Sequence, residues 1–419
     1  MGEYPEGKER RMLATLIPIF DANMAVYSYS IFAQKENFFL NPGIDGRAKF
    51  DGAMNIMGMD MIRTIGVPIL SDDKVLFVEV NNVSLFSNLL EQAPETDPHT
   101  VVVLIDNSVK PEEMYINRIK ELKEQGFQMA LKKVTVERFE AYKEIISMMD
   151  YVLLDHKKIN MKNAKFFFDK FFPDVKLCAV NIDTKEEYES LIEDGGYDLY
   201  EGGFFRMPVT KGVQEVAPLK LTYIELLNVV NDPDFKLTDA AEVIGRDTAL
   251  VLSLLEIVNH MAVNSEIKSV QHAAAMLGQK ELRRWINTAV AKELCVDKPS
   301  EIMRLSLLRA KFAENLGKLF DLGGLSSELF LMGLFSVLDL ILEKPMAEAL
   351  ELVKVSNAIR RALLDDTGEL APVLDFMKKY EEADWHEISR IMVIRDIEMD
   401  PVYDAYVDSL HWYRELLRV

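Results

Sequence analysis

The strongest constraint on the fold of this chain is a change of pattern near residue 206. Before that point, short runs of β-branched and aromatic residues alternate with longer amphipathic stretches, and after it helical patterns continue almost to the end. Strands that alternate with helices predict parallel pairing through right-handed crossovers. A chain of 419 residues is long enough for two or three domains. We therefore predict an α/β domain at residues 1–205 and an all-helical domain at residues 206–419, which includes a C-terminal helical tail.

Seven strands are expected in the first half, and they leave two architectures open. These are a (β/α) barrel and an open, doubly wound sheet. Neither a GxGxxG nor a GxxxxGK(S/T) motif follows an early strand, which disfavours a nucleotide-binding doubly wound fold. The expected strands are Thr15–Phe20, Ala25–Phe32, Val75–Val80, Val101–Asp106, Phe127–Leu131, Tyr151–Leu154 and Val175–Asn181, and the expected helices are Pro111–Gln125, Glu137–Met149, Lys162–Phe172 and Lys185–Asp194.

Composition excludes several classes of protein. Acidic residues outnumber basic ones by 68 to 48, which gives a net charge of −20 and argues against non-specific binding to nucleic acid. Cys178 and Cys295 both lie between apolar neighbours, so we expect two buried thiols in a reducing compartment and no cysteine-based metal site. The most apolar window, Leu329 to Leu342, is too short to span a bilayer. The N-terminal charges precede no long apolar stretch, so we expect a cytoplasmic protein without a membrane partner.

Seven segments of the first half, in order, resemble the EAL family of cyclic-di-GMP phosphodiesterases. They are IPIFDANMAVYSYSIFAQ, VEVNNVS, VVVLIDNSV, EQGFQMALKKV, DYVLLD, KLCAVNIDT and GYDLYEGGFF, and together they cover Leu13 to Phe205. The likeness is greatest to the compact EAL half of bacterial EAL–HDOD signalling proteins. It implies a TIM-type (β/α) barrel with its site at the carboxyl ends of the strands.

The same resemblance shows that most of the metal-binding acids of those enzymes are replaced in this chain. Their positions are occupied by Ser30, Leu104, Lys132, Lys133 and Val180. A polar group is kept at four other positions, namely Asn81, Asp155, Asp183 in place of a glutamate, and Glu201 in place of a glutamine.

These replacements argue against catalysis of the family type. Hydrolysis assisted by divalent cations needs oxygen ligands that converge on the metal, and a lysine ammonium has no lone pair to offer and repels Mg²⁺. We therefore expect no catalytic residue, no metal and no cofactor. Two interpretations of the lysines stay open. Lys132 and Lys133 could bind a phosphate where the metals would sit, or they could be solvated at the end of a strand. Neighbouring strand residues face opposite sides, so at most one of them should point into the barrel mouth.

The second half resembles the HDOD domain, a non-catalytic relative of the HD phosphohydrolases. The resemblance rests on the segment DTALVLSLL from Asp247, on Val258-Asn259, and on IKSVQHAA from Ile267 with the closing Leu277-Gly278. The His-Asp pair of the true HD enzymes corresponds to Ser336 and Val337. An HD metal site needs imidazole and carboxylate groups together, so this half is also expected to lack catalysis. Asp339 is the nearest acid along the chain.

Together these observations predict a non-catalytic signal-transduction protein that acts as a regulatory protein-interaction scaffold. Its partners would be unidentified signalling proteins, and the aromatic tail from Asp384 to Val419 could pack between the domains or across a homodimer. Two alternatives stay open. One is a metal-independent cyclic-di-GMP receptor. The other is a weak phosphodiesterase that has rebuilt its metal site from other acids.

Overall fold

The computed structural model describes residues 12–34, 56–210, 218–232, 234–261, 267 and 269–417. The N-terminal residues on which the expectation about secretion depended lie outside this set. Two compact units divide the chain, one made of Met1–Met207 with Phe376–Val419 and the other of Pro208–Asp375. No helix within the described ranges is long and apolar enough to cross a membrane.

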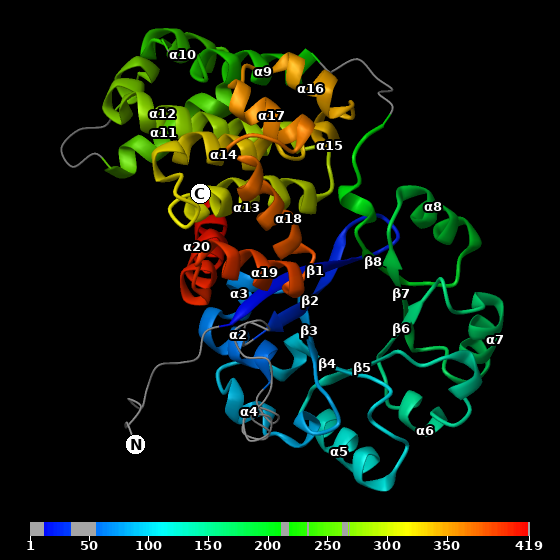
Figure 1. Cartoon of the computed structure of the whole chain (residues 1–419). Coiled ribbons are helices and arrows are strands. Elements are labelled where there is room, and N and C mark those ends of the chain that lie inside the picture. The colour runs from blue at the N-terminus through cyan, green and yellow to red at the C-terminus, as the bar shows by residue number, and fades with distance from the viewer. Residues whose placement is uncertain are drawn as a thin grey trace, which may run out of the picture. The chain divides into compact units, whose positions relative to one another are not determined.

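The first unit is built on a closed barrel of eight strands in sequence order (Figure 1). All seven predicted strands are present, and an eighth, near the end of the resemblance, was not predicted as a strand. It is short, and two of its four residues, Glu201 and Gly202, are not apolar. The strands are β1 (Leu13–Phe20), β2 (Val26–Gln34), β3 (Val75–Glu79), β4 (Val101–Ile105), β5 (Gln128–Lys132), β6 (Tyr151–Asp155), β7 (Lys176–Ile182) and β8 (Leu199–Gly202).

Parallel pairing holds from β2 to β8, but β1 runs antiparallel to both of its neighbours. The expectation of parallel pairing throughout was therefore wrong for the first strand. Residues 21–25 are too few for a crossover, so β1 and β2 must form a hairpin. The Asp21 carboxylate fixes the turn, because it accepts hydrogen bonds from the backbone N–H groups of Asn23 at 2.8 Å and Ala25 at 2.9 Å.

Inward-facing apolar side chains fill the barrel. The interior cluster includes Phe77 from β3, Leu104 from β4, Leu153 from β6 and Leu199 from β8, each almost fully buried. All five residues of β4 are buried, as expected for a parallel strand that is covered on both faces. The barrel is therefore a packed core, and any site must lie at its ends.

Helices follow most of the strands of the first unit. The predicted helices after β4, β6 and β7 are present, but Glu137–Met149 is broken into two short turns, η3 (Val136–Arg138) and α6 (Lys143–Ile146). The α-helices before the C-terminal segment are α2 (Met57–Ile65), α3 (Val67–Ser71), α4 (Leu89–Gln92), α5 (Glu113–Glu124), α6, α7 (Met161–Phe171) and α8 (Lys185–Asp194), and the remaining 3₁₀ turns are η1 (Ser84–Phe86), η2 (Pro98–Thr100) and η4 (Phe204–Arg206).

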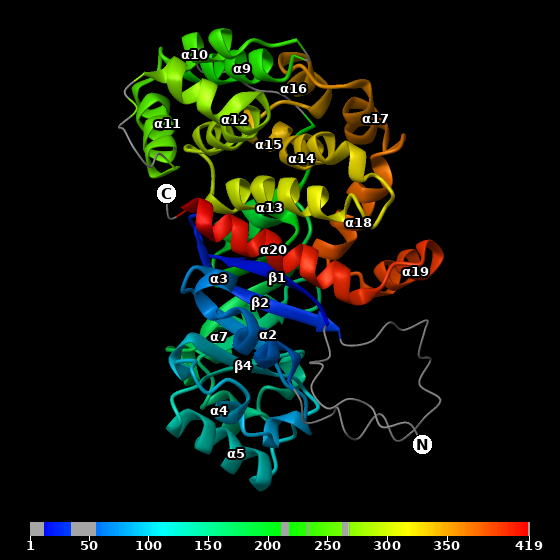
Figure 2. The same ribbon diagram turned by 90° about the vertical axis from the view of Figure 1, so that its left-hand side faces the viewer.

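The C-terminal segment packs on the barrel. It consists of the end of α18 (Ala371–Glu381), α19 (Trp385–Arg395) and α20 (Met399–Leu417), and α20 lies against β1 and α3 (Figure 2). The buried Tyr380 hydroxyl accepts a hydrogen bond from the Ala14 N–H at 3.2 Å, and Arg414 forms an ion pair with Asp72. The tail thus belongs to the barrel unit, whereas the predicted division placed it with the helical domain.

The second unit is entirely helical within the described residues. Its members are α9 (Pro218–Val230), α10 (Leu237–Ile244), α11 (Thr248–Met261), α12 (Val270–Leu294), α13 (Ser300–Leu316), η5 (Gly323–Leu325), α14 (Ser326–Phe335), α15 (Leu338–Leu342), α16 (Met346–Leu352) and α17 (Asn357–Asp365). A kink interrupts α12 at Gly278, whose φ of 72° suits glycine. Ser336 and Val337 separate α14 from α15.

Candidate functional site

The carboxyl ends of β2 to β8 meet at one edge of the barrel because these strands are parallel. The predicted site residues all come from this edge. Lys132 and Glu201 are within strands, Asp155 ends β6, and Asn81, Lys133 and Asp183 follow strands by one or two residues. We call this edge the barrel mouth.

Lys132 points into the barrel mouth. Register pairs it with Leu153 on β6, a member of the interior cluster, and only 15% of its side chain is exposed. Its Nζ lies 2.6 Å from Glu79 Oε2. Glu79 was not identified from the sequence, although the alternation of β3 places it on the same face as the interior residue Phe77.

Glu201 is the second carboxylate near Lys132. Burial raises the pKa of Glu201 to about 7, and the positive charge of Lys132 partly opposes that rise. One ammonium therefore lies among two carboxylates, and one of these changes its charge near neutral pH. The arrangement is an ion pair between Lys132 and Glu79, with Glu201 close enough for the charge of Lys132 to affect its pKa.

Lys133 points away from the mouth. Its φ of 61° marks the end of the strand, and 59% of its side chain is exposed. It lies 3.5 Å from Asp106 Oδ2. Burial raises the pKa of Asp106, but hydrogen bonds from Ser108 and the charge of Lys133 outweigh this effect and leave the pKa lowered. The expectation that at most one of the two lysines faces inward agrees with this geometry.

Asp155 and Asp183 are also paired with lysines. Asp155 lies 2.6 Å from Lys158 and accepts the Lys157 N–H at 3.2 Å, and the pKa of Asp155 is lowered because these contacts outweigh its burial. Asp183 lies 2.5 Å from Lys157 Nζ. Asp155 thus stabilises its own loop after β6, and Asp183 joins the loop after β7 to that loop through Lys157.

The Asn81 side chain stabilises a turn. Its side-chain oxygen accepts the backbone N–H groups of Val83 and Ser84, both at 2.8 Å, at the start of η1. Ser30, at the position of the leading glutamate of the EAL motif, is 2% exposed, and its hydroxyl has no hydrogen-bond partner. The Asn81 oxygen is thus engaged by backbone N–H groups, and the Ser30 hydroxyl is buried and carries no negative charge for a metal.

The donor set at the mouth does not fit a pair of divalent cations. Glu79, Asp106, Asp155 and Asp183 each have a lysine within 3.5 Å, and the lysine side chains would have to move before a metal could replace them. Within the described ranges, no group of three or more His, Cys, Asp or Glu side chains is arranged to hold a metal ion.

In the second unit, Ser336, which is at the position of the HD histidine, and the nearby Asp339 both form hydrogen bonds within the fold. Ser336 accepts a hydrogen bond from Arg309 Nη1 at 3.2 Å and donates one to the Gly333 carbonyl at 2.7 Å. Asp339 is 4% exposed and accepts the Val209 N–H at 3.0 Å. Burial raises the pKa of Asp339 above its ordinary value, although several hydrogen bonds oppose the shift. Asp339 therefore anchors the segment that leads into this unit.

Comparison with known proteins agrees with the two-part architecture. The HDOD domain model matches residues 216–367. The chain is 25% identical over 416 residues to the uncharacterized protein YuxH of Bacillus subtilis, covering 97% of this chain and 99% of YuxH. It is 24% identical over 338 residues to the cyclic di-GMP phosphodiesterase CdgJ of Vibrio cholerae, covering 79% of this chain and 78% of CdgJ.

Among solved structures, the chain is similar to Klebsiella pneumoniae BlrP1 in its complex with manganese and cyclic-di-GMP. The TM-score is 0.38 at 11% identity, and the match covers 48% of this chain and 56% of BlrP1. The family match and the closed barrel confirm the predicted order of a (β/α) barrel and a helical HDOD region. This chain thus carries a helical region, residues 216–367, that matches the HDOD domain model, and its N-terminal half is a closed eight-stranded barrel.

Proposed function

We propose that this protein is a non-catalytic component of cyclic-di-GMP signalling that acts as a regulatory scaffold for other proteins. The observation that carries the proposal is the position of Lys132, whose ammonium lies inside the barrel mouth within 2.6 Å of Glu79. The relative CdgJ is named as a cyclic di-GMP phosphodiesterase, and this supports a link to that nucleotide. The chemistry at the mouth argues against turnover.

Electrostatics gives the physical reason. Two Mg²⁺ or Mn²⁺ ions would bring four positive charges to a site where Lys132 already neutralises Glu79. A lysine cannot ligate a cation, and repulsion between like charges is strong in a poorly solvated site. Without the metals, the site would lack both the activated water and the stabilisation of charge on the phosphate.

Incubation of the full chain with cyclic-di-GMP and either Mg²⁺ or Mn²⁺ tests this proposal. We expect no linear dinucleotide above the level of a reaction without protein. As a control for contaminating enzymes, Lys132→Ala with Lys133→Ala should give the same background. Linear product from the native chain, at a level that the double variant does not reach, would refute the proposal and favour the residual phosphodiesterase.

A metal-independent receptor for cyclic-di-GMP is the second candidate. It is favoured by the exposed ammonium groups of Lys133 and Lys158 beside the mouth, whose side chains are 59% and 77% exposed. Both groups already have a carboxylate partner, which weakens this candidate. Calorimetry with cyclic-di-GMP in the presence of EDTA distinguishes the two, because a receptor releases or absorbs heat and a scaffold without nucleotide binding does not.

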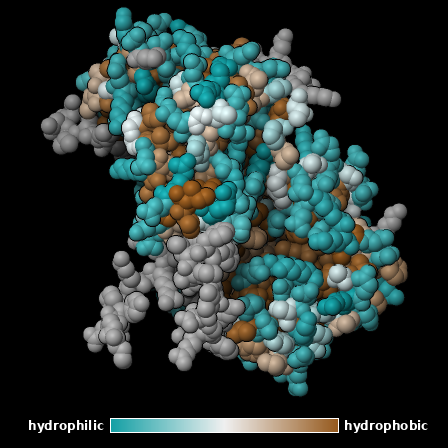
Figure 3. All heavy atoms as spheres, in the orientation of Figure 1, coloured by the Kyte–Doolittle hydropathy of each residue, from teal (hydrophilic) through white to brown (hydrophobic). Residues whose placement is uncertain are grey.

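The scaffold role requires a surface for partner proteins. The face drawn in Figure 3 is mostly hydrophilic, with apolar residues in separate patches. The most exposed large apolar residues of the described chain are scattered, with Val296 between α12 and α13 at 77%, Phe166 on α7 at 70% and Ile394 on α19 at 68%. Affinity capture should recover the same partner from independent preparations, and light scattering should report whether the chain forms a homodimer. Failure to recover any reproducible partner would count against the scaffold.

A further inference from the structure

A cavity of about 520 Å³ lies in the helical unit, and residues of this unit alone line it. Its walls come from α12, α13, α14 and α17, together with the segments that follow α9 and α16. This volume is within the range of about 300 to 1,000 Å³ that is usual for small-ligand sites. The positions that correspond to the HD pair, Ser336 and Val337, do not line it.

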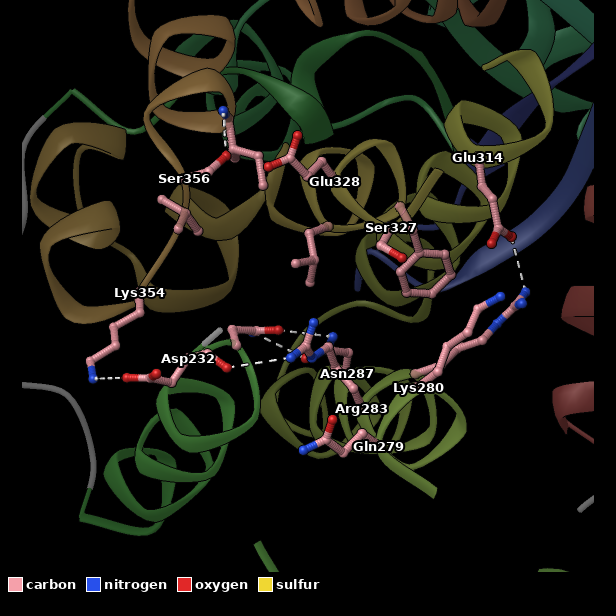
Figure 4. Close-up of a pocket in the computed structure, with 16 residues that line it drawn as sticks. Asp232, Gln279, Lys280, Arg283, Asn287, Glu314, Ser327, Glu328, Lys354 and Ser356 are labelled. Atoms are coloured by element: carbon pink, nitrogen blue, oxygen red, sulfur yellow. Dashed lines mark hydrogen bonds and ion pairs between the residues drawn. The ribbon is translucent and has the colours of Figure 1, made fainter. Parts of the chain in front are cut away.

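One wall of the cavity is cationic. Lys280, Arg283 and Arg284 are three and four residues apart on α12, so they lie on one face of the helix. Figure 4 shows Arg283 and Asn287 on one side of the cavity, with Ser327, Glu328 and Ser356 on the other. In a chain with a net charge of −20, three cations on one cavity wall are a marked local reversal of sign.

Arg283 has unused hydrogen-bonding capacity. Its guanidinium donates from Nη2 to the Asp232 carbonyl at 3.3 Å and lies over the Phe235 ring at 5.0 Å. Its Nε is buried and has no hydrogen-bond partner. A guanidinium carries five N–H donors, and a buried donor without an acceptor is costly. A ligand in the cavity cannot reach the buried Nε, so the remaining Nη N–H groups of the guanidinium are the donors that it offers to an anion.

The other charges of the cavity are largely compensated within it. Arg284 pairs with Glu314 at 3.0 Å, and Lys354 pairs with Asp232 at 3.1 Å. Lys280 has no ion pair with any residue in the described part of the chain. The ammonium of Lys280 and the guanidinium of Arg283 are therefore the positive groups left for a ligand.

The apolar part of the lining indicates what the rest of the ligand is like. Phe330, Leu331, Val355 and Ile359 also line the cavity, and they can contact a flat or apolar body. The Phe330 ring lies 5.5 Å from the Arg284 guanidinium. Glu328 also lies there, and its carboxylate can accept hydrogen bonds from hydroxyl or amino groups but repels a second anionic group.

We infer that this cavity binds a small organic phosphate, with the phosphate on Lys280 and Arg283 and the body between Phe330 and Ile359. Arginine matches the geometry of phosphate through paired N–H donors, and lysine adds a point charge. The binding site is independent of the barrel mouth, and its ligand would allow the helical unit to respond to a metabolite. This inference goes beyond the proposed function and does not depend on it.

Calorimetry on the full chain tests the inference with three probes, namely inorganic phosphate, adenosine 5′-monophosphate and unphosphorylated adenosine. We expect the monophosphate to bind more tightly than either phosphate or adenosine. Arg283→Ala should weaken its binding by about tenfold or more, and Arg283→Lys by less. Arg246→Ala is the matched control, because Arg246 is in the same unit and pairs with Glu225 and Glu242 outside the cavity. This variant should bind the monophosphate as tightly as the native chain does.

Lys280→Ala provides a second variant in case Arg283→Ala does not fold, since no ion pair with a described residue is lost. It should also weaken binding of the monophosphate. Lys132→Ala at the barrel mouth should have no effect, which separates this site from any nucleotide binding by the barrel. The inference is overturned if neither phosphate probe binds at millimolar concentration, if adenosine binds as tightly as its monophosphate, or if the folded cavity variants bind like the native chain.

Discussion

At the scale of single residues, the alternation of side chains along β5 decides the chemistry of the barrel mouth. Lys132 is the last residue of the strand and faces inward, and Lys133, with its φ of 61°, faces outward. The two lysines are adjacent in sequence but have different partners, Glu79 and Asp106. Of these two lysines, only Lys132 has a mostly buried side chain, with 15% exposed against 59% for Lys133.

Removal of Lys132 should leave Glu79 without its ion-pair partner and Glu201 without the positive charge that acts on it. We expect Lys132→Ala to lower the free energy of unfolding of the barrel unit by about 1–3 kcal/mol at pH 8, because a partly buried charge loses its partner. Lys133→Ala is the control, and it removes only an exposed pair, so it should cost about 0.5 kcal/mol or less. Urea denaturation of both variants measures the difference, and equal losses would contradict the assignment of Lys132 to the interior.

Glu201 should make stability depend on pH. Its pKa is raised from 4.5 to about 7 in the folded chain, so the folded state binds more protons than the unfolded state between these values. Stability contributed by this group is therefore full below about pH 4.5 and falls as the pH rises through 7. Glu201→Gln should match the native chain near pH 4.5 and exceed its free energy of unfolding by about 1–3 kcal/mol at pH 8. Denaturation at both pH values tests this, and a constant difference would argue against a raised pKa.

At the scale of helices and strands, close packing in the helical unit depends on Gly333 of α14. A Cβ at this position would lie 2.3 Å from the Arg309 carbonyl oxygen of α13, which is backbone and cannot rotate away. The absence of a side chain therefore allows the two helices to approach closely along the faces that carry Arg309 and Ser336.

Gly333→Ala should therefore force α13 and α14 apart. We expect a loss of about 2–4 kcal/mol in the free energy of unfolding of the helical unit, of the size found for overpacked or strained cores. Gly324→Ala is the matched control, because a Cβ there meets no atom within 4 Å. Thermal denaturation followed by far-UV circular dichroism should detect the difference between the two variants. A Gly333→Ala protein as stable as the control would show that the contact relaxes easily.

At the scale of the whole molecule, the C-terminal segment completes the barrel unit. Residues Phe376–Val419 group with the barrel, although about 170 residues of the helical unit separate them from it in sequence. Two hydrogen bonds illustrate how the segment is attached to the barrel. The Tyr380 hydroxyl accepts one from the Ala14 N–H, and Gln34 Nε2 donates one to Ser389 Oγ at 3.3 Å.

Fragments of the chain should behave according to this division. We expect residues 208–375 to fold as an independent helical domain, since they form their own compact unit. Residues 1–207 expressed alone should aggregate or lose stability, because removal of the tail uncovers β1 and α3. Limited proteolysis and circular dichroism of both fragments measure this. A well-folded, soluble fragment of residues 1–207 would contradict the structural role of the tail.

The sequence by itself determined the class of the fold and showed that lysines occupy positions at the barrel mouth where acidic metal ligands were expected. Strand and helix periodicity located seven of the eight strands. The motifs that resemble EAL and HDOD domains gave the order of the two domains, with the barrel first and the helical region second. Residue identity alone was enough to show that Lys132 and Lys133 cannot be metal ligands, because ligation depends on the atoms that a side chain carries. Burial of Cys178 and Cys295 was likewise predictable from their apolar neighbours.

Tertiary structure decided which residues meet. Glu79 could not be recognised as the partner of Lys132, because the two are 53 positions apart and become neighbours only when the strands close into a barrel. The cavity beside Arg283 depends on the packing of helices that are distant in sequence, and the tail could be assigned to the barrel only from its contacts. Periodicity records which face of an element is buried, whereas the choice of partner for that face is made by long-range packing, which local sequence does not encode.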